Sequence, residues 1–323
     1  MIIKKREVPL TIQKLQALQR RIPKHHPKQP IIREKLAKRL AGFKGESSID
    51  YPLSFLPEKN YFILHDVRLY DSTHHFQMDS LLLSRQFILI LEVKNYSGTL
   101  YFDQTFHQLI RTLDGKQEVF PDPLLQIQRQ EQQLKKWLAM NRLPEVPIIS
   151  LVVISNPYTL LQSSSEHKDL YQKVIRSEYL PTKINQIQEK FQEDQLSEKE
   201  LKKVIRRIEK QHSSSNPDIL EQFELSKDDL LKGVFCTTCN YLPVQRTYGT
   251  WNCPECSCEI KNAHLASIKD YELLIGLKFT NSDMREFLQI TSPSLMTRIL
   301  QSMDLSYAGT RKNRVYHFGN EEK

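Results

Sequence analysis

Two strongly apolar runs most restrict how this chain can fold. Residues 87–91 read Phe-Ile-Leu-Ile-Leu, and residues 147–155 read Pro-Ile-Ile-Ser-Leu-Val-Val-Ile-Ser. Short runs rich in aromatic and β-branched residues are typical of strands buried on both faces of a sheet. We therefore expect the first run to form a central strand of a sheet that is flanked by helices.

Charged residues gather at the end of the first run. Glu92 and Lys94 are separated by a single apolar residue, so the period-two alternation of a strand places both on one face. Residues 76–83 read as the preceding strand of a hairpin, and pairing in register would return Asp79 close to Glu92. Unpaired charges at the end of a core strand are costly, so these groups need a partner, a metal or water.

Two carboxylates and a lysine at one strand end suit the hydrolysis of a phosphodiester. Hard oxygen ligands hold Mg²⁺ or Mn²⁺, which also bind phosphate oxygens, and a nearby lysine can position or deprotonate the attacking water. The alternative is an exposed Glu-x-Lys ion pair at a strand end with a turn aspartate nearby. The three residues alone do not decide between these interpretations.

Two helix patterns flank the predicted strands. One runs from about 31 to 51 and carries Glu46, while the other starts at Asp122, an N-cap followed by proline, and runs to about Met140 with Gln126 near its start. The order of a helix, antiparallel strands, a helix and a strand predicts a mixed α/β domain, which we place at residues 31–160.

The positive charge of the chain is concentrated near its N-terminus. The 323 residues carry a formal net charge of +8, and residues 1–44 contain 13 Lys or Arg against two acids. We interpret residues 1–30 as a basic extension, with a mobile linker around its prolines, that could contact a polyanion. A solvated helix face would explain the same pattern.

Apolar segments long enough for a membrane or a secretory signal are not evident. The longest candidate is interrupted by Ser84-Arg85-Gln86, and the first ten residues lack an apolar core. We therefore expect a cytoplasmic protein without a membrane partner. Because all five cysteines fall between Cys236 and Cys258, they indicate a local metal site rather than a disulfide framework.

Two Cys-x-x-Cys pairs match a structural zinc site. Four thiolates at this spacing suit a closed tetrahedral Zn²⁺ site, and redox use or iron–sulfur ligation is the alternative. Cys258 reads as a spectator and His264 as a surface residue. The expected ligands are Cys236, Cys239, Cys253 and Cys256.

The remaining segments are interpreted as a linker and two small modules. Residues 161–233 read as a helical linker, 234–262 as a zinc ribbon, and 263–323 as a winged-helix-like domain or, alternatively, a small helical domain packed on the zinc module. In the DNA-binding interpretation, one helix faces the major groove and a basic hairpin touches phosphates. The candidate contacts are Ser292, Ser294, Arg298, Arg311, Lys312 and Arg314.

Several sequence blocks in the same order resemble the nuclease-related domain (NERD) family. The blocks are Gly45-Glu46, Gln77-Met78-Asp79, residues 91–98 (LEVKNYSG), and Asp122-Pro123-Leu124 followed by Gln126. That family is grouped with the PD-(D/E)XK nucleases, whose restriction-endonuclease-like core is a mixed sheet flanked by helices. The resemblance covers about residues 33–155.

The resemblance implies roles for the charged residues. Asp79 and Glu92 would bind Mg²⁺ with help from the Val93 carbonyl, and Met78 stands where the superfamily name would place a proline. Lys94 would orient the attacking water. Glu46 would be an additional acid on the helix, and Gln126 would brace the site.

The leading hypothesis is a Mg²⁺-dependent deoxyribonuclease whose zinc ribbon and winged helix locate the substrate. The first alternative is a non-catalytic nucleic-acid-binding or regulatory protein that retains a nuclease-like fold. A nuclease acting on RNA is a third hypothesis, which substrate preference would distinguish.

Overall fold

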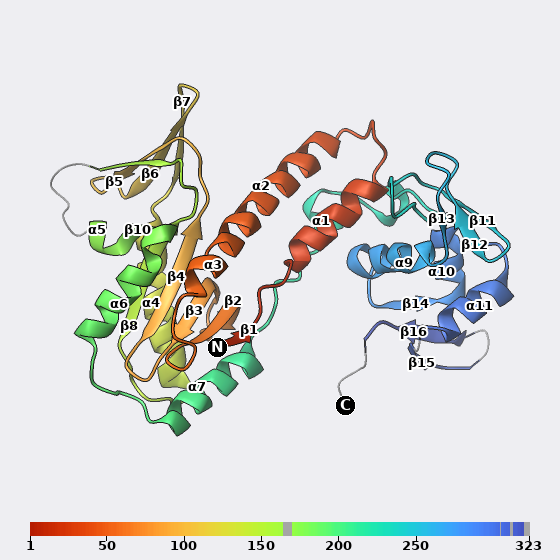
Figure 1. The fold of residues 1–323 in the computed structure, drawn as a ribbon. Coiled ribbons are helices and arrows are strands. Elements are labelled where there is room, and N and C mark those ends of the chain that lie inside the picture. The colour runs from red at the N-terminus through yellow and green to blue at the C-terminus, as the bar shows by residue number, and fades with distance from the viewer. Residues whose placement is uncertain (164–169, 304, 311–312, 320–323) are drawn as a thin grey trace. The chain divides into compact units, whose positions relative to one another are not determined.

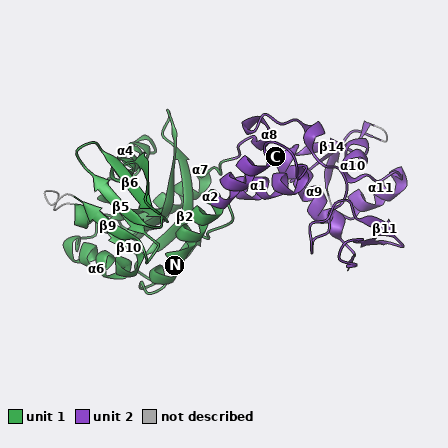
Figure 2. Cartoon of the chain, turned by 90° about the horizontal axis from the view of Figure 1, so that it is seen from above, with its two compact units in different colours: residues 1–9, 38–215 green, residues 10–37, 216–323 purple. Residues whose placement is uncertain are grey.

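The computed structural model describes residues 1–163, 170–303, 305–310 and 313–319. The chain forms two compact units, which Figure 2 colours separately. Unit 1 comprises residues 1–9 and 38–215, and unit 2 comprises residues 10–37 and 216–323. Each unit is therefore built from two separate stretches of chain. The sequence instead predicts five consecutive segments and does not predict this interleaving.

A six-stranded mixed sheet forms the centre of unit 1 (Figure 1). The strands follow the order β1-β2-β3-β4-β8-β10, in which β2, β3 and β4 are antiparallel and the other neighbours are parallel. This confirms the predicted mixed α/β core. The strands are β1 (Ile2–Lys4), β2 (Phe62–Tyr70), β3 (His75–Leu83), β4 (Ile88–Lys94), β8 (Ile148–Ile154) and β10 (Val174–Arg176).

Strand β4 lies at the centre of the sheet, as its apolar sequence predicts. It pairs with β8 over its whole length, from Ile88 opposite Ile148 to Lys94 opposite Ile154. On its other edge, Ser80 of β3 lies opposite Leu91. One step further along this hairpin, Asp79 reaches the level of Glu92, so the register brings the two acids to the same end of the sheet.

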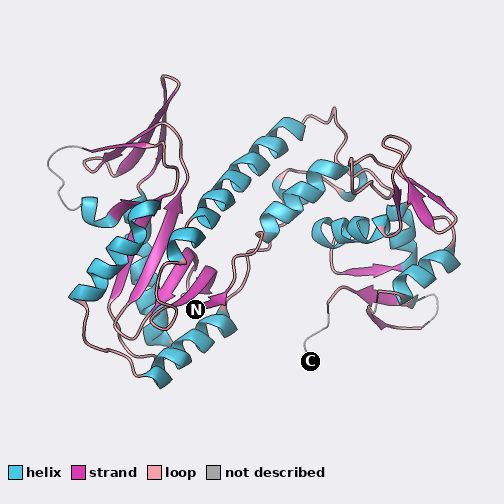
Figure 3. Cartoon of the chain, in the orientation of Figure 1, coloured by secondary structure: helices cyan, strands magenta, loops and turns pink. Residues whose placement is uncertain are grey.

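Apolar side chains cover both faces of β4, and helices lie on both sides of the sheet (Figure 3). Ile88 and Ile90 pack in one cluster with Trp137 of α4 (Pro123–Met140) and Val204 of α7 (Glu198–Gln211). Leu89 and Leu91 pack in another with residues of α3 (Asp50–Leu53) and α6 (Leu180–Lys190). Because side chains alternate along the strand, Glu92 and Lys94 continue the row that faces α4.

The segment expected as a linker at 161–233 contributes largely to unit 1. Strand β10 extends the central sheet, and the apolar face of α7 enters the core through Leu201, Val204, Ile205 and Ile208. A second sheet has the order β7-β6-β5-β9. Its strands are β5 (Thr99–Asp103), β6 (Gln108–Leu113), β7 (Lys116–Pro121) and β9 (Leu160–Ser163), and α5 (Leu170–Lys173) follows.

Unit 2 combines the first helix of the chain with the C-terminal elements. Helix α1 (Leu10–Arg21) packs against α9 (Ala263–Leu274), and α2 (Gln29–Ser48) begins in unit 2 and continues into unit 1. The buried Arg21 ties α1 in place because its Nε donates to Asp270 at 2.9 Å and its Nη1 to the Gly233 carbonyl at 2.7 Å. The basic N-terminal extension thus contains a helix that packs into unit 2.

The rest of unit 2 consists of short strands and helices. One three-stranded sheet comprises β11 (Gln245–Thr247), β12 (Thr250–Asn252) and β13 (Glu259–Ile260). A second, ordered β14-β16-β15, accompanies two helices. These elements are β14 (Lys278–Thr280), α10 (Asn281–Leu288), α11 (Pro293–Gln301), β15 (Ser306–Ala308) and β16 (Val315–His317), and α8 (Ile219–Gln222) precedes them all.

Candidate active site

The three residues singled out at the strand end lie together in the structure. Lys94 Nζ is 2.7 Å from Glu92 Oε1, and the Val93 amide donates to Asp79 Oδ2 at 2.7 Å. Glu92 is only 4% exposed. The ion pair therefore exists, but it is largely buried, in contrast to the exposed pair that the alternative interpretation requires.

Helix α4 holds the Glu92 carboxylate through two glutamines. Its start follows from sequence, because the Asp122 side chain accepts the Leu124 amide ahead of Pro123. Gln126 Nε2 donates to Glu92 Oε1 at 2.6 Å, and Gln126 Oε1 accepts Lys94 Nζ at 2.9 Å. Gln126 thus bridges both members of the ion pair, in the place expected for a bracing residue.

Gln130 is a second brace to which the sequence analysis assigns no role. One turn after Gln126, its Nε2 donates to Glu92 Oε2 and to the Gln77 carbonyl, both at 2.8 Å. Its Oε1 is buried without a hydrogen-bond partner among the described residues, which costs about 1–3 kcal/mol. The spacing of four residues between Gln126 and Gln130 could have indicated this role, because it places both amides on one face of the helix.

Glu46 reaches the site because α2 approaches the end of β4 very closely. A Cβ on Gly45 would lie 2.3 Å from the Asn95 Cβ and 2.8 Å from Ser155 Oγ, so only glycine permits this approach. Asn95 Nδ2 also donates to the Ala41 carbonyl of the same helix at 2.7 Å. Gly45 therefore allows α2 to pack closely against the end of β4, and this packing brings Glu46 to the site.

Three carboxylates influence one another at this site. Burial, followed by the charges of Glu92 and Glu46, raises the pKa of Asp79 well above its usual value. Burial also raises the pKa of Glu46, against the opposing effect of Arg6. Burial acts to lower the pKa of Lys94, but Glu92 outweighs it and the net direction is upward, which keeps the ammonium charged. The acids thus form a local concentration of negative charge that a cation would relieve.

Arg6 is a component of this site that sequence reasoning missed. Its side chain is 4% exposed, and its Nη1 lies 3.3 Å from Glu46 Oε2 and 3.4 Å from the Asp79 carbonyl. Its Nη2 donates to Asp50 Oδ1 at 3.1 Å and to Ser80 Oγ at 3.0 Å. One guanidinium therefore connects the N-terminal segment, α2, α3 and β3.

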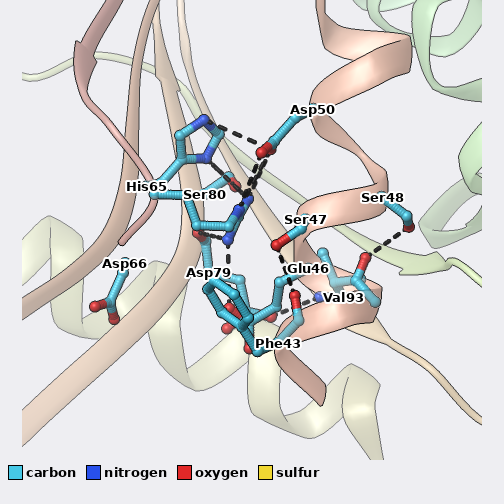
Figure 4. A network of polar contacts seen from close by, with 12 residues as sticks. Phe43, Glu46, Ser47, Ser48, Asp50, His65, Asp66, Asp79, Ser80 and Val93 are labelled. Carbon is cyan, nitrogen blue, oxygen red and sulfur yellow. Dashed lines mark hydrogen bonds and ion pairs between the residues drawn. The ribbon is translucent and has the colours of Figure 1, made fainter. Parts of the chain in front are cut away.

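His65 of β2 completes the network around this guanidinium. Its Nδ1 lies 2.9 Å from both Arg6 Nη2 and Ser80 Oγ, and its Nε2 is 3.7 Å from Asp50 Oδ1. Burial, together with the Arg6 charge, lowers the pKa of His65 to about 4, so the ring is neutral at pH 7. Figure 4 shows Glu46 on α2 and Asp50 on α3, with Asp50 facing His65 and Ser80 on the strands.

A polar hollow adjoins the glutamine side of the site. It has a volume of about 500 Å³ and lies between the β2–β3 turn and α4. Four glutamines line it, among them Gln126 and Gln130, together with His74, His75, Phe76 and Arg129. The exposed Tyr70 packs its ring against His75, with ring centroids 4.9 Å apart. Amide groups, a cation and the His75 ring thus line a hollow beside the glutamines that hold Glu92, and Tyr70 packs on that ring.

The four predicted zinc ligands converge in unit 2. Their sulfur atoms all lie within 4.8 Å of one another, with 3.6 Å between Cys236 and Cys256 and 3.5 Å between Cys239 and Cys253. Such a thiol cluster could hold one tetrahedral zinc ion. His264 is a correction to the sequence analysis, because it is buried and its Nδ1 accepts the Trp251 indole N–H at 3.2 Å.

The candidate nucleic-acid contacts in unit 2 have mixed placements. Ser292 is the N-cap of α11, where its hydroxyl accepts the Leu295 amide, while Ser294 and Arg298 are exposed on that helix. The Arg314 guanidinium lies 4.1 Å above the Tyr307 ring. Arg311 and Lys312 lie outside the described residues.

Comparison with known proteins supports a nuclease-related domain in unit 1. Residues 41–155 match the family model described as "Nuclease-related domain" (NERD). An uncharacterized protein from Bacillus anthracis is 28% identical over 107 residues, which cover 32% of this chain and 49% of that protein. The chain therefore spans about half the length of this relative. No solved structure matches the chain. Among the described residues, no helix has the length and apolar character needed to cross a membrane.

Proposed function

We propose that this protein is a divalent-metal-dependent nuclease that hydrolyses phosphodiester bonds in DNA. The observation that carries the proposal is the convergence of Asp79, Glu92 and Lys94 at one end of a central sheet, with Glu46 nearby. The match of residues 41–155 to a nuclease-related family model agrees with this chemistry. Mutual repulsion among buried and half-buried acids is otherwise unfavourable, so the arrangement is better explained by a ligand than by stability.

The donor set fits Mg²⁺ or Mn²⁺. Asp79 and Glu92 would supply carboxylate oxygens, with the Val93 carbonyl as a further oxygen ligand and Glu46 as an additional acid. Such hard oxygen donors are the preferred ligands of these ions, whereas the thiols of unit 2 suit zinc. A bound Mg²⁺ would supply charge neutralisation at the phosphate and would facilitate ionisation of the attacking water.

The surrounding side chains have separate tasks in this mechanism. Lys94 stays charged and can donate a hydrogen bond to the attacking water while it remains paired with Glu92. Gln126 and Gln130 fix the Glu92 carboxylate, because their amides reach both of its oxygens. Pre-orienting a ligand in this way avoids the cost of rearranging it during reaction.

The polar hollow is the proposed path of the substrate chain. Arg129 can pair with a phosphate next to the bond that is cleaved, and the Tyr70–His75 pair can stack on a base. In unit 2, we assign the thiol cluster to a structural zinc ribbon and residues 263–323 to a winged-helix-like segment that locates DNA. The exposed Ser294 and Arg298 on α11, with Arg311, Lys312 and Arg314, remain the proposed contacts.

A nuclease panel tests the proposal. The 323-residue protein is incubated with single-stranded, duplex and branched DNA and with RNA, in the presence of Mg²⁺ or Mn²⁺. We expect cleavage of at least one DNA form, its loss in Glu92→Gln and Lys94→Met, and little change in DNA affinity. Lys135→Met, an exposed change on the same helix α4, is the matched control. Cleavage of RNA alone would assign the substrate to RNA instead.

A non-catalytic nucleic-acid-binding protein is the second candidate, and one observation favours it. Both oxygens of Glu92 already accept hydrogen bonds from Lys94, Gln126 and Gln130, so this carboxylate is well satisfied without a metal. If divalent ions bind at Asp79 and Glu92 while every nucleic acid in the panel stays intact, this second function replaces the first.

A further inference from the structure

Arg6 lies far in sequence from every residue so far assigned to the metal site. It precedes residues 41–155, which match the nuclease-related family model, by 35 positions or more. We propose that the N-terminal segment is an integral part of the active site and that Arg6 is a positioning residue for the divalent metal. This inference rests on the proposed metal site, because it assigns a residue that shapes that site.

The fold brings Arg6 to the site through strand pairing. Strand β1 runs parallel to β2, with Ile2 opposite Ile63 and Lys4 opposite Leu64. Lys4 Nζ also donates to the carbonyls of His65 and Asp66 at 2.9 and 3.1 Å. These contacts fix the segment two residues before Arg6, so the position of its guanidinium does not depend on a free chain end.

The contacts of Arg6 divide into an anchoring side and a site-facing side. Asp50 accepts from both Nε and Nη2, and His65 and Ser80 bond to Nη2, which together hold the guanidinium plane. The remaining nitrogen, Nη1, reaches Glu46 Oε2 and the Asp79 carbonyl. One rigid group thus sets the side chain of one site acid and the main chain of another.

The charge of Arg6 also serves the site. Arg6 Nη1 lies 3.3 Å from Glu46 Oε2, so its positive charge offsets part of the negative charge that gathers at the site. Asp50 offsets much of the positive charge of Arg6, which limits its repulsion of an incoming cation. Lysine could not reproduce this arrangement, because a single ammonium lacks the planar fork that reaches several acceptors at once.

The test compares Arg6→Met, Arg6→Lys and the matched control Lys5→Met in the 323-residue, zinc-loaded protein. Lys5 is the exposed neighbour of Arg6 and carries the same charge. Mn²⁺ affinity is measured without nucleic acid, from the loss of the free-ion electron paramagnetic resonance signal. Loss of a residue that orients metal ligands typically weakens metal affinity about 10–100-fold, which we expect for Arg6→Met. Arg6→Lys should show a smaller but measurable loss of Mn²⁺ affinity, and Lys5→Met should match the wild type.

Melting temperature and kinetics separate positioning from a merely structural role. A folded Arg6→Met that binds Mn²⁺ as tightly as the wild type would overturn the inference. If Arg6→Met does not fold, Arg6→Lys decides, since unchanged affinity refutes the role and a measurable loss supports it. With a cleavable substrate, we expect a higher Mg²⁺ concentration for half-maximal rate and a nearly unchanged rate at saturating Mg²⁺. A fall in the saturating rate with unchanged Mg²⁺ dependence would also count against positioning.

The result is independent of the fate of the proposed function. If no nucleic acid is cleaved but Mn²⁺ affinity depends on Arg6, the nuclease proposal fails and the positioning role stands. If DNA is cleaved and Arg6→Met leaves Mn²⁺ affinity and Mg²⁺ dependence unchanged, only the role of Arg6 fails.

Discussion

Replacing Asp79 by asparagine should stabilise the metal-free protein while abolishing cleavage. The Asp79 carboxyl is crowded by Glu92 and Glu46, and its pKa is raised mainly by burial. Asparagine keeps an oxygen that can accept the Val93 amide, so the substitution removes the charge without removing that hydrogen bond. Stabilising single substitutions are typically worth about 0.5–2 kcal/mol, so we expect an increase of this size in the free energy of unfolding.

The pH dependence follows from the direction of the pKa shift. Because the folded-state pKa of Asp79 lies above its unfolded-state value, ionisation of this group opposes folding. That penalty declines as pH falls through the folded-state pKa and vanishes below the unfolded value of about 3.9. The stability advantage of Asp79→Asn should therefore shrink on acidification.

Thermal and urea unfolding in Mg²⁺-free, zinc-containing buffer measure the effect. For a unit of this size, each kcal/mol corresponds to a change in Tm of about 2–4 °C. Added Mg²⁺ should raise the Tm of the wild type and leave Asp79→Asn unchanged, since only a site that binds the ion gains by mass action. Asp103→Asn is a control that should decrease the free energy of unfolding. Hydrogen bonds from Gln108 and the Phe106 amide lower the pKa of Asp103, so its ionised form favours folding. A clear loss of stability in metal-free Asp79→Asn at neutral pH would refute the crowding argument.

Three further predictions address the braces, the zinc site and the hollow. Gln130→Leu should weaken Mn²⁺ binding about tenfold or more, as measured by paramagnetic resonance, because one oxygen of Glu92 loses its donor. Cys253→Ser should reduce the zinc content of purified protein and lower the Tm of unit 2, since Cys253 belongs to its buried core; equal zinc in the variant would contradict the ligand set. Arg129→Gln should raise KM for single-stranded DNA and reduce the salt slope of log affinity by about 0.7, whereas Lys135→Gln should change neither.

The parts of the fold that sequence predicted depend on local signals. The apolar run before Glu92 has no polar face to expose to water, so it predicts a strand buried on both faces. The structure places this strand between two apolar clusters. The Asp122-Pro123 pair fixes the start of α4, and thereby the side of the helix on which Gln126 lies. The spacing of the cysteines likewise predicts their geometry, because the two cysteines of each Cys-x-x-Cys pair lie in one short turn.

The parts that sequence could not predict depend on distant pairings. Arg6 contacts the Asp79 carbonyl across 73 positions, and its own surroundings show only a basic segment. Helix α7 is plainly amphipathic, but periodicity does not say which apolar surface covers it, so packing against β2 was indistinguishable from a role as a spacer. Arg21 presents the same difficulty, because nothing near it indicates the buried Asp270, which lies 249 positions away.

The two-part construction of unit 2 determines how the protein can be dissected. A single proteolytic cut near Ser215 would leave residues 10–37 attached to the larger fragment and residues 216–323 in the smaller one. These fragments share the buried contact of Arg21 with Asp270 and the Gly233 carbonyl, so they should stay associated as a nicked complex. For the same reason, a recombinant fragment of residues 216–323 would lack helix α1, which packs against α9. Adding a peptide of residues 10–37 should restore this packing.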